Sequence, residues 1–236
     1  MTRPVVLITG AARGIGRAIA DNLAVDHDIA LTYHTAAPEA AVFLSENPSA
    51  LIRQADLSTC PPADLIAEVM DHFGRIDGLV NNAGTIQNTS LDDYDPQAAA
   101  LIMQMNALVP LGLIAAATPH MLPGASIVNV TSVNAKYPPA DAPVYGASKA
   151  ALDSLTKSCA KALGPKGIRI NALAPGAVER DYAPRPQDLI ALFEKDTAMG
   201  QLATDAQIAD TVRFLLSDAA SGITGDTITV SAGYRL

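Results

Sequence analysis

The segment VYGASKAAL, residues 144–152, places a tyrosine and a lysine four positions apart. In a helix, Tyr145 and Lys149 lie one turn apart on the same face. A tyrosine rarely gives up its proton near neutral pH, because its ordinary pKa is about 10. A neighbouring ammonium stabilises the phenolate and lowers that pKa. The pair therefore predicts a group that donates and accepts a proton. An exposed helix on which the two side chains merely align is the alternative.

A glycine-rich turn lies near the start of the chain. The segment TGAARGIG, residues 9–16, joins an apolar run to a helical pattern, and its glycines are spaced G-x-x-x-G-x-G. Such glycines let the backbone turn sharply and approach a pyrophosphate, whose charge the first amides of the next helix stabilise. No Gly-Lys-Ser/Thr follows, which excludes a Walker loop. We expect a dinucleotide site, with an ordinary glycine-rich turn as the alternative.

The residues after the second and third apolar runs indicate which dinucleotide binds. An acidic residue after the second run would hold the ribose 2′-hydroxyl of NAD, but Tyr33 and His34 stand there. Arg13, inside the glycine turn, can meet a 2′-phosphate, so NADP is favoured and NAD is the alternative. Arg13 could instead be a solvated surface charge. Asp56 follows the third run, where it could accept the adenine amino group or cap the next turn.

The elements that position these residues alternate along the chain. Strands are expected at residues 4–10, 29–33, 49–56, 77–84, 126–132, 168–176 and 226–230. Helices are expected at residues 15–25, 38–47, 62–74, about 96–118, 143–164, 186–199 and 204–217. This alternation predicts an α/β fold, with a Rossmann-type, doubly wound parallel sheet in three layers. No linker-like segment divides residues 1–236, so we predict a single domain that binds its ligands at the carboxyl ends of the strands.

The composition narrows the class of protein. Hydrophobic residues make up 49% of the chain and mean hydropathy is +0.21, which argues against disorder. A net charge of −8 argues against a nucleic-acid partner. Cys60 and Cys159 have no disulfide or metal spacing, so we expect a cytoplasmic protein without a metal. The apolar segment 98–122 is interrupted by Gln104, Asn106 and Pro110, and we interpret it as a buried helix rather than a membrane span.

The motifs together resemble those of a known family. After TGAARGIG come Asp56, NNAG at 81–84, Asn106, Ser132, YGASK at 145–149 and PG at 175–176. In this order and spacing, the chain resembles the short-chain dehydrogenase/reductase family of classical type, over nearly its whole length. The resemblance implies hydride transfer between NADP, or NAD, and a carbonyl or alcohol substrate. The catalytic residues that it implies are Asn106, Ser132, Tyr145 and Lys149. The implied cofactor-binding residues are Gly10, Arg13, Gly14, Ile15, Gly16, Tyr33, His34, Asp56, Leu57, Asn82, Ala83, Gly84, Tyr145, Lys149, Pro175, Gly176 and Val178.

The residue types suit this chemistry. Reduction of a carbonyl leaves negative charge on its oxygen, which needs hydrogen-bond donors and then a proton. Tyr145 would give the proton and Ser132 would orient the carbonyl, unless Ser132 is an ordinary hydroxyl at a strand end. The resemblance implies that Lys149 grips the ribose hydroxyls and that Asn106 helps hold a water in a proton relay. Asn82 could instead bridge neighbouring strands through hydrogen bonds.

One region departs from the family pattern. Relatives carry a threonine in a P-G-x-x-x-T pattern, whereas Arg180 stands at that place here. Relatives build a substrate lid from the following segment, which we expect at about 177–200. In that segment Arg180, Tyr182 and Arg185 could meet an acidic or polar substrate, or could be solvated.

Two alternative functions and an oligomeric state are also compatible with the sequence. Reduction of 3-oxoacyl-carrier-protein substrates is one alternative, but His120 is the only candidate cation before the fifth strand for an acidic carrier. A non-catalytic nucleotide sensor is the other, and it would not need Tyr145 and Lys149. The family usually forms dimers or tetramers through its long helices, so a homodimer or homotetramer through 97–118 and 143–164 is expected. No membrane partner is expected.

Overall fold

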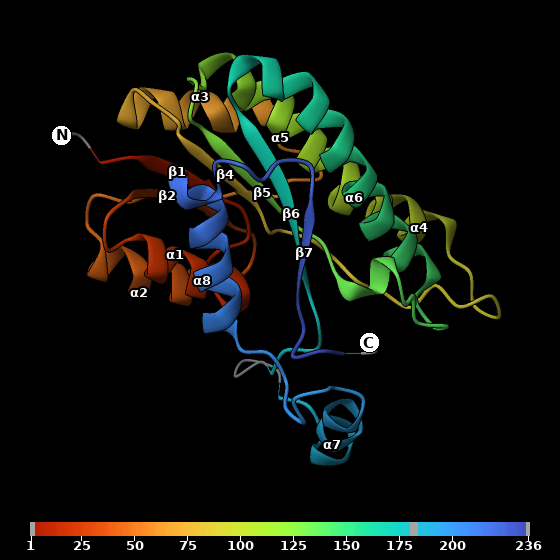
Figure 1. Cartoon of the computed structure of the whole chain (residues 1–236). Coiled ribbons are helices and arrows are strands. Elements are labelled where there is room, and N and C mark those ends of the chain that lie inside the picture. Colours follow the sequence, from red (N-terminus) through yellow and green to blue (C-terminus); the bar gives the residue numbers. More distant parts are fainter. Residues whose placement is uncertain (1–2, 180–183, 235–236) are drawn as a thin grey trace.

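The sheet has seven parallel strands in the order β3-β2-β1-β4-β5-β6-β7 (Figure 1). The computed structural model describes residues 3–179 and 184–234. The chain moves outward from β1 to β3 and then returns to place β4 beside β1. The predicted doubly wound α/β fold is therefore confirmed. The strands are β1 Val5–Ile8, β2 Asp28–Tyr33, β3 Leu51–Gln54, β4 Gly78–Asn81, β5 Ser126–Val130, β6 Arg169–Pro175 and β7 Thr227–Val230.

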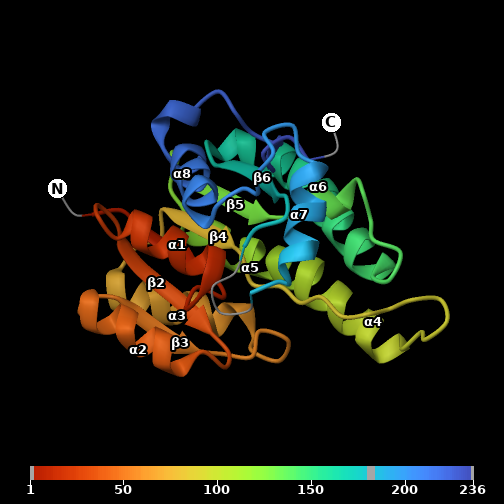
Figure 2. The ribbon, with the colours of Figure 1, turned by 90° about the horizontal axis from the view of Figure 1, so that it is seen from below.

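Helices cover both faces of the sheet and make three layers (Figures 1 and 2). Alternate side chains of β1 point to opposite faces: Val6 and Ile8 join one buried cluster, whereas Val5 and Leu7 join the other. The first cluster packs beneath α1 Gly14–Leu23, α2 Ala37–Glu46 and α8 Asp205–Leu216. The second packs beneath α3 Pro62–Phe73, α5 Val109–Ala117 and α6 Pro143–Leu163. Short 3₁₀ turns occupy Thr118–His120, Val133–Ala135, Gly164–Lys166 and Asp218–Ala220.

The long apolar helix differs from its predicted form. It consists of α4 Pro96–Met103, a π-helical turn at Gln104–Leu108, and α5. The π turn inserts one extra residue into the helix and contains Asn106. Such turns are frequent at functional sites, which agrees with the role expected for Asn106. The continuous stretch Pro96–His120 has the length and hydropathy of a membrane span, but 44% of its most apolar window is buried inside the molecule. A core helix of a soluble protein can have the same length and hydropathy.

Other predicted elements were too wide, because an apolar pattern does not mark where regular hydrogen bonding stops. Strand pairing covers Val5–Ile8 rather than 4–10, Leu51–Gln54 rather than 49–56 and Gly78–Asn81 rather than 77–84. Strand β5 ends at Val130, two residues before Ser132, and the helix expected at 186–199 covers Gln187–Lys195.

The helix α7, Gln187–Lys195, stands beyond the carboxyl ends of the strands (Figures 1 and 2). None of its residues is buried, and its Leu189 and Leu192 are exposed, although its apolar residues recur at helical spacing. Isolated bridges join Val178 to Ala203 and Thr197 to Tyr234. The predicted residues Arg180 and Tyr182 lie outside the described residues.

Candidate active site

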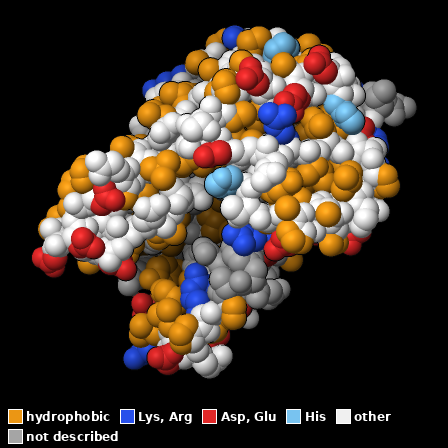
Figure 3. Space-filling model, turned by 180° about the vertical axis from the view of Figure 1, so that it is seen from behind, with side chains coloured by type: hydrophobic (Ala, Val, Ile, Leu, Met, Phe, Trp, Pro, Cys, Tyr) orange, Lys and Arg blue, Asp and Glu red, His pale blue; other side chains and the backbone are white. Residues whose placement is uncertain are grey.

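A cleft of about 550 Å³ lies at the carboxyl ends of the strands, where the strand order reverses between β1 and β4. Figure 3 shows this hollow between the body of the molecule and the lobe that carries α7. Two of the predicted site residues, Gly14 and Asn106, do not line the cleft. The predicted residues that line it are Gly10, Arg13, Ile15, Gly16, Tyr33, His34, Asp56, Leu57, Asn82, Ala83, Gly84, Ser132, Tyr145, Lys149, Pro175, Gly176 and Val178.

The glycine turn requires its glycines. Gly10 and Gly14 have φ angles of +64° and +59°, a backbone conformation that side chains disfavour. A Cβ on Gly16 would lie 2.5 Å from Asn82 Nδ2 and 2.5 Å from Gly10 O. Asn82 Nδ2 donates to Thr9 O (2.9 Å) and Gly10 O (3.0 Å), which fastens the turn to the end of β4. Asn82 therefore has the bridging role considered from the sequence.

At the other side of the turn, the cleft has the composition expected for a 2′-phosphate. Arg13 is exposed at the N-terminus of α1, and Tyr33 and His34 follow β2 with no carboxylate among residues 33–38. Asp56 Oδ1 accepts from Ser58 N (2.9 Å) and Ser58 Oγ (2.7 Å), and these hydrogen bonds lower the pKa of its carboxyl. Asp56 thus caps its turn, as the alternative held, while it also faces the cleft.

Tyr145 and Lys149 lie in the first two turns of α6 and both line the cleft. Lys149 Nζ lies 5.9 Å from the centroid of the Tyr145 ring and donates to Val130 O at the end of β5 (2.8 Å). Only 5% of Lys149 is exposed. Burial lowers the pKa of its ammonium to about 8, against the opposing charge of Asp153. The structure thus brings a phenol and a buried cation together, and the exposed-helix alternative does not describe this pair.

Ser132 is oriented by its own turn. Its Oγ accepts from Asn134 N (3.1 Å) and so caps the 3₁₀ turn Val133–Ala135. Because a hydroxyl has one hydrogen to donate and two lone pairs, this contact uses one lone pair and leaves the O–H able to donate. Ser132 lines the same cleft as Tyr145 and Lys149. It can therefore act both as a turn cap and as a donor to a substrate oxygen.

Asn106 lies behind the cleft and fixes its wall. Its Nδ2 donates to Thr85 O (2.9 Å) and Ser148 Oγ (2.9 Å), and its Oδ1 accepts from Thr85 N (2.8 Å). A Cβ on Gly84 would lie 2.9 Å from Asn106 Oδ1 and 3.4 Å from Lys149 Nζ. The side chain therefore ties the segment after β4 to α6. A water held by Asn106 stays a prediction, since both of its side-chain N–H groups bind protein atoms.

The C-terminal part of the chain also contributes to the cleft. Arg185 Nη1 donates to the Val178 carbonyl, and the guanidinium carbon lies 5.8 Å from the centroid of the Phe193 ring. Arg185 and Asp205 both line the cleft. The sequence singled out Arg185 by its charge and place after PG. It offered no signal for Asp205 beyond the start of a helix.

Comparison with known proteins agrees with this geometry. A family model described as enoyl-(acyl carrier protein) reductase matches residues 10–235. The chain is 35% identical over 239 residues to the 3-oxoacyl-(acyl-carrier-protein) reductase FabG of Staphylococcus aureus, covering 98% of this chain and 97% of that one. A short-chain dehydrogenase/reductase from Serratia marcescens superposes with a TM-score of 0.94 at 29% identity, covering 100% and 99% of the two chains. A short-chain dehydrogenase from Burkholderia cenocepacia, solved in complex with NADP, gives a TM-score of 0.91 at 32% identity, covering 98% and 97%.

Proposed function

Because the chain belongs to the short-chain dehydrogenase/reductase family, we propose that it is an NADP-preferring oxidoreductase that interconverts a carbonyl and an alcohol. The observation that carries this proposal is the phenol of Tyr145 beside the buried ammonium of Lys149, in one cleft with the hydroxyl of Ser132. The complex of the Burkholderia cenocepacia relative supports NADP as the cofactor.

The cleft fits a dinucleotide. Gly10, Gly14 and Gly16 carry no side chains that would keep a pyrophosphate from the backbone of the turn, and the N-terminus of α1 directs its amides there. Arg13 would meet the 2′-phosphate, Asp56 and Leu57 would border the adenine, and Lys149 would bind the ribose beside the nicotinamide. Pro175, Gly176 and Val178 would border the nicotinamide itself. When bound, this cofactor supplies or accepts the hydride.

The side chains of the chain itself handle the proton. Ser132 donates a hydrogen bond to the substrate oxygen, which gathers negative charge during reduction. Tyr145 gives its proton to that oxygen, and the Lys149 ammonium stabilises the phenolate that remains. Asn106 keeps the wall beside Lys149 in place.

The substitution Tyr145→Phe tests this assignment. It removes the proton donor and keeps the ring, so we expect turnover to fall on the order of 10²- to 10⁴-fold while NADPH still binds. Turnover is measured by NADPH oxidation with a panel of ketones and aldehydes, and binding by NADPH fluorescence. Tyr137→Phe is the matched control, because Tyr137 lies outside the cleft. A wild-type protein that binds NADPH and reduces no member of the panel would instead support the non-catalytic sensor.

The second candidate is a reductase of 3-oxoacyl thioesters. The 35% identity to the FabG reductase of Staphylococcus aureus and the description of the matching family favour it. His120, the candidate cation for an acidic carrier protein, is exposed before β5, at the end of that strand remote from the cleft. Reduction of a four-carbon 3-oxoacyl thioester, measured free and on a carrier protein, separates this activity from reduction of simple ketones.

We further propose that the chain works in the cytoplasm, apart from membranes, as a homodimer or homotetramer. The free thiols of Cys60 and Cys159 suit a reducing compartment. Leu108, 58% exposed on the long apolar helix, supports association through segments 97–118 and 143–164. The segment 177–200 with α7 would form the substrate lid. Light scattering in solution tests the assembly.

A further inference from the structure

A third ionisable side chain continues the row that Tyr145 and Lys149 begin on α6. Asp153 follows Lys149 by four residues, so the three side chains lie one turn apart on the same face of the helix. Asp153 is half-buried, whereas Lys157, one turn further, is exposed. A carboxylate withdrawn from water costs free energy unless hydrogen bonds and charges compensate for it. Its contacts therefore indicate what it does at this position.

Two hydroxyls lie against the Asp153 carboxylate, one on β7 and one just after β5. Thr227 Oγ1, on β7, donates to Asp153 Oδ1 (3.2 Å). The Thr131 side chain lies within hydrogen-bond reach of the carboxylate and lowers its pKa, while its Oγ1 can also donate to Leu173 O (3.3 Å). Thr131 directly precedes Ser132, and its backbone N–H donates to Leu173 O on β6 (2.7 Å). Asp153 and Ser132 also line a second cavity of about 120 Å³. Asp153 is therefore fixed against the strand end that carries a catalytic residue.

Positive charges surround Asp153 on the helix and beside it. The pKa of its carboxyl is raised overall, because burial is the largest effect, and the two hydroxyls and the ammonium groups of Lys157 and Lys136 lower it only in part. We expect the carboxylate to be ionised at neutral pH, because hydroxyls that can donate to it and ammonium groups lie around it. Among the described residues, these groups include Thr131 after β5, Thr227 on β7, Lys136 after the 3₁₀ turn, and Lys149 and Lys157 on α6. The hydroxyls of Ser132, Tyr137, Thr229, Ser231 and Tyr234 line the same cavity.

Lys149, unlike Asp153, has little around its buried charge to compensate for the loss of water. Its ammonium is almost wholly withdrawn from water and donates a hydrogen bond to a neutral carbonyl, Val130 O. Burial lowers the pKa of this ammonium to about 8, and Asp153 is the charge that raises it. Without that charge, Lys149 would lose its proton closer to neutral pH, and a neutral amine stabilises a phenolate much less.

We propose that Asp153 is a positioning residue whose carboxylate, held by Thr131 and Thr227, keeps the buried Lys149 in its charged form for catalysis. The effect on turnover rests on the proposed function. The charge coupling between Asp153 and Lys149 along one face of α6 can be measured whether or not the protein is an enzyme.

The substitution Asp153→Asn tests the coupling, because it removes the charge and keeps an oxygen that can accept from Thr227. NADPH affinity, measured by fluorescence, should be lost at alkaline pH, and in Asp153→Asn we expect this loss to occur at a pH lower by about one unit. One unit is the low end of the pKa shift that a nearby opposite charge produces. The alkaline limb of kcat should move with it. Asp153→Glu should restore the wild-type limb. Asp226→Asn is the matched control, since Asp226 is an exposed neighbour of Thr227 whose oxygen only accepts from Thr227 N (2.7 Å).

The pH dependence of unfolding gives a readout without cofactor or substrate. In the wild type, the free energy of unfolding should begin to rise near the pKa of Lys149, and in Asp153→Asn the rise should begin at lower pH. In a Lys149→Met background, Asp153→Asn should leave the alkaline range unchanged. If Asp153→Asn does not fold, Asp153→Ser replaces it in all measurements.

The proposal is overturned if the alkaline limbs of Asp153→Asn and wild type coincide, or if Asp153→Glu shifts the limb as far as Asp153→Asn. Either result leaves the proposed function intact when the wild type reduces carbonyls. A shifted unfolding curve in a protein without turnover would support the coupling and refute the enzyme.

Discussion

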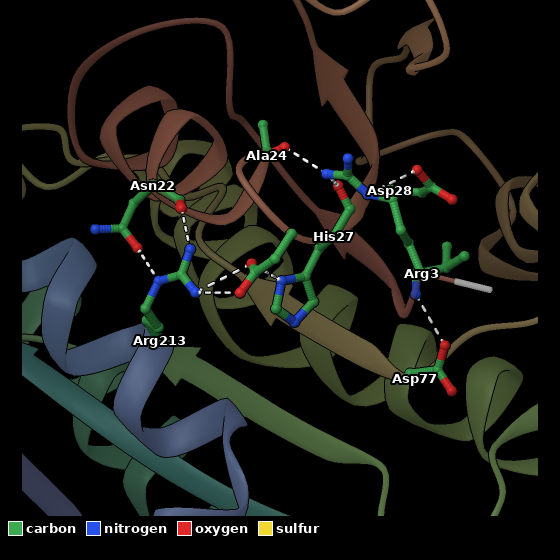
Figure 4. Close-up of polar contacts among 9 residues, drawn as sticks. Arg3, Asn22, Ala24, His27, Asp28, Asp77 and Arg213 are labelled. Atoms are coloured by element: carbon green, nitrogen blue, oxygen red, sulfur yellow. Dashed lines mark hydrogen bonds and ion pairs between the residues drawn. The ribbon is translucent and has the colours of Figure 1, made fainter. Parts of the chain in front are cut away.

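Charged side chains gather at both ends of the parallel sheet, in different surroundings. At the amino ends of β1, β2 and β4, arginines form ion pairs near the surface, and Figure 4 shows those of Arg3 and Arg213. Arg213 of α8 contacts both oxygens of Asp26 (3.0 and 2.8 Å), and this contact lowers the pKa of the Asp26 carboxyl. At the carboxyl ends, Lys149 is buried and its ammonium pKa is lowered to about 8. Pairing stabilises charge at one end, and burial destabilises it at the other.

This difference separates structural charges from a functional one. Exposed pairs stabilise a fold only slightly, since water screens them, but they cost little to form. A buried ammonium costs free energy in the folded state and persists where function requires it. The contrast predicts that mutations at the two ends will affect stability and activity in opposite ways.

The largest effect is expected from Lys149→Met, which removes the buried charge and keeps an apolar side chain. Turnover should fall on the order of 10²- to 10⁴-fold. Stability at pH 7 should nevertheless rise. A pKa lowered from 10.5 to about 8 corresponds to a penalty of roughly 3 kcal/mol, and the lost hydrogen bond to Val130 returns about 1 kcal/mol of it.

The sign of its pH dependence follows from proton binding. Between the folded pKa near 8 and the unfolded value of 10.5, the unfolded wild type binds more protons, so its stability rises with pH. Lys149→Met should lack this rise, and its advantage should shrink toward pH 10. Urea unfolding at neutral and alkaline pH measures both. A variant that is less stable than wild type by the same amount throughout contradicts the comparison.

The next effect sharpens the comparison between an exposed arginine, Arg13, and a half-buried one, Arg213. Arg13 lines the cofactor cleft, whereas Arg213 joins α8 to the end of α1. Arg13→Ala should weaken NADP binding about tenfold, the scale of one charge-assisted hydrogen bond, and leave NAD binding unchanged. Arg213→Ala is the control and should leave both affinities unchanged. Titration by fluorescence or calorimetry decides; an equal loss for NAD and NADP excludes a contact to the 2′-phosphate.

The sequence was sufficient to predict the order of elements and the position of most cleft residues. Apolar strands alternate with helices, and residues that follow parallel strands meet at one edge of the sheet. Asn82, Ser132 and Pro175 could therefore be placed near one another from their positions alone. Tyr145 and Lys149 could be placed on one helix face from their spacing.

The remaining features depend on tertiary packing. The π turn around Asn106 shifts hydrogen bonding by one residue within a largely apolar helix, and no residue pattern marks that shift. Lys149 looks like an ordinary lysine until its burial against Val130 is known. The role of Asp153 depends on its contacts with Thr131 and Thr227, which are distant from each other in the chain and so could not be predicted from the sequence.

The smallest effect is expected at the amino ends of the strands. Arg213 Nε donates to Asn22 Oδ1 (2.6 Å), and Asp26 also lies 2.6 Å from His27 Nδ1 (Figure 4). Arg213→Met keeps the stem and removes these donors, so the free energy of unfolding should fall by about 1 kcal/mol at low salt and by less at high salt.

The pH dependence of this loss should be the reverse of that at Lys149. A lowered carboxyl pKa stabilises the fold above the unfolded value of 3.8, and this contribution is lost as pH falls through the still lower folded value. The difference between Arg213→Met and wild type should therefore be constant near neutral pH and shrink in acid, with turnover unchanged. Urea unfolding at several pH values and salt concentrations measures it, with Asp26→Asn as the partner variant. A loss of turnover in Arg213→Met would show that the two ends of the sheet are coupled, because no described contact of Arg213 reaches the cleft.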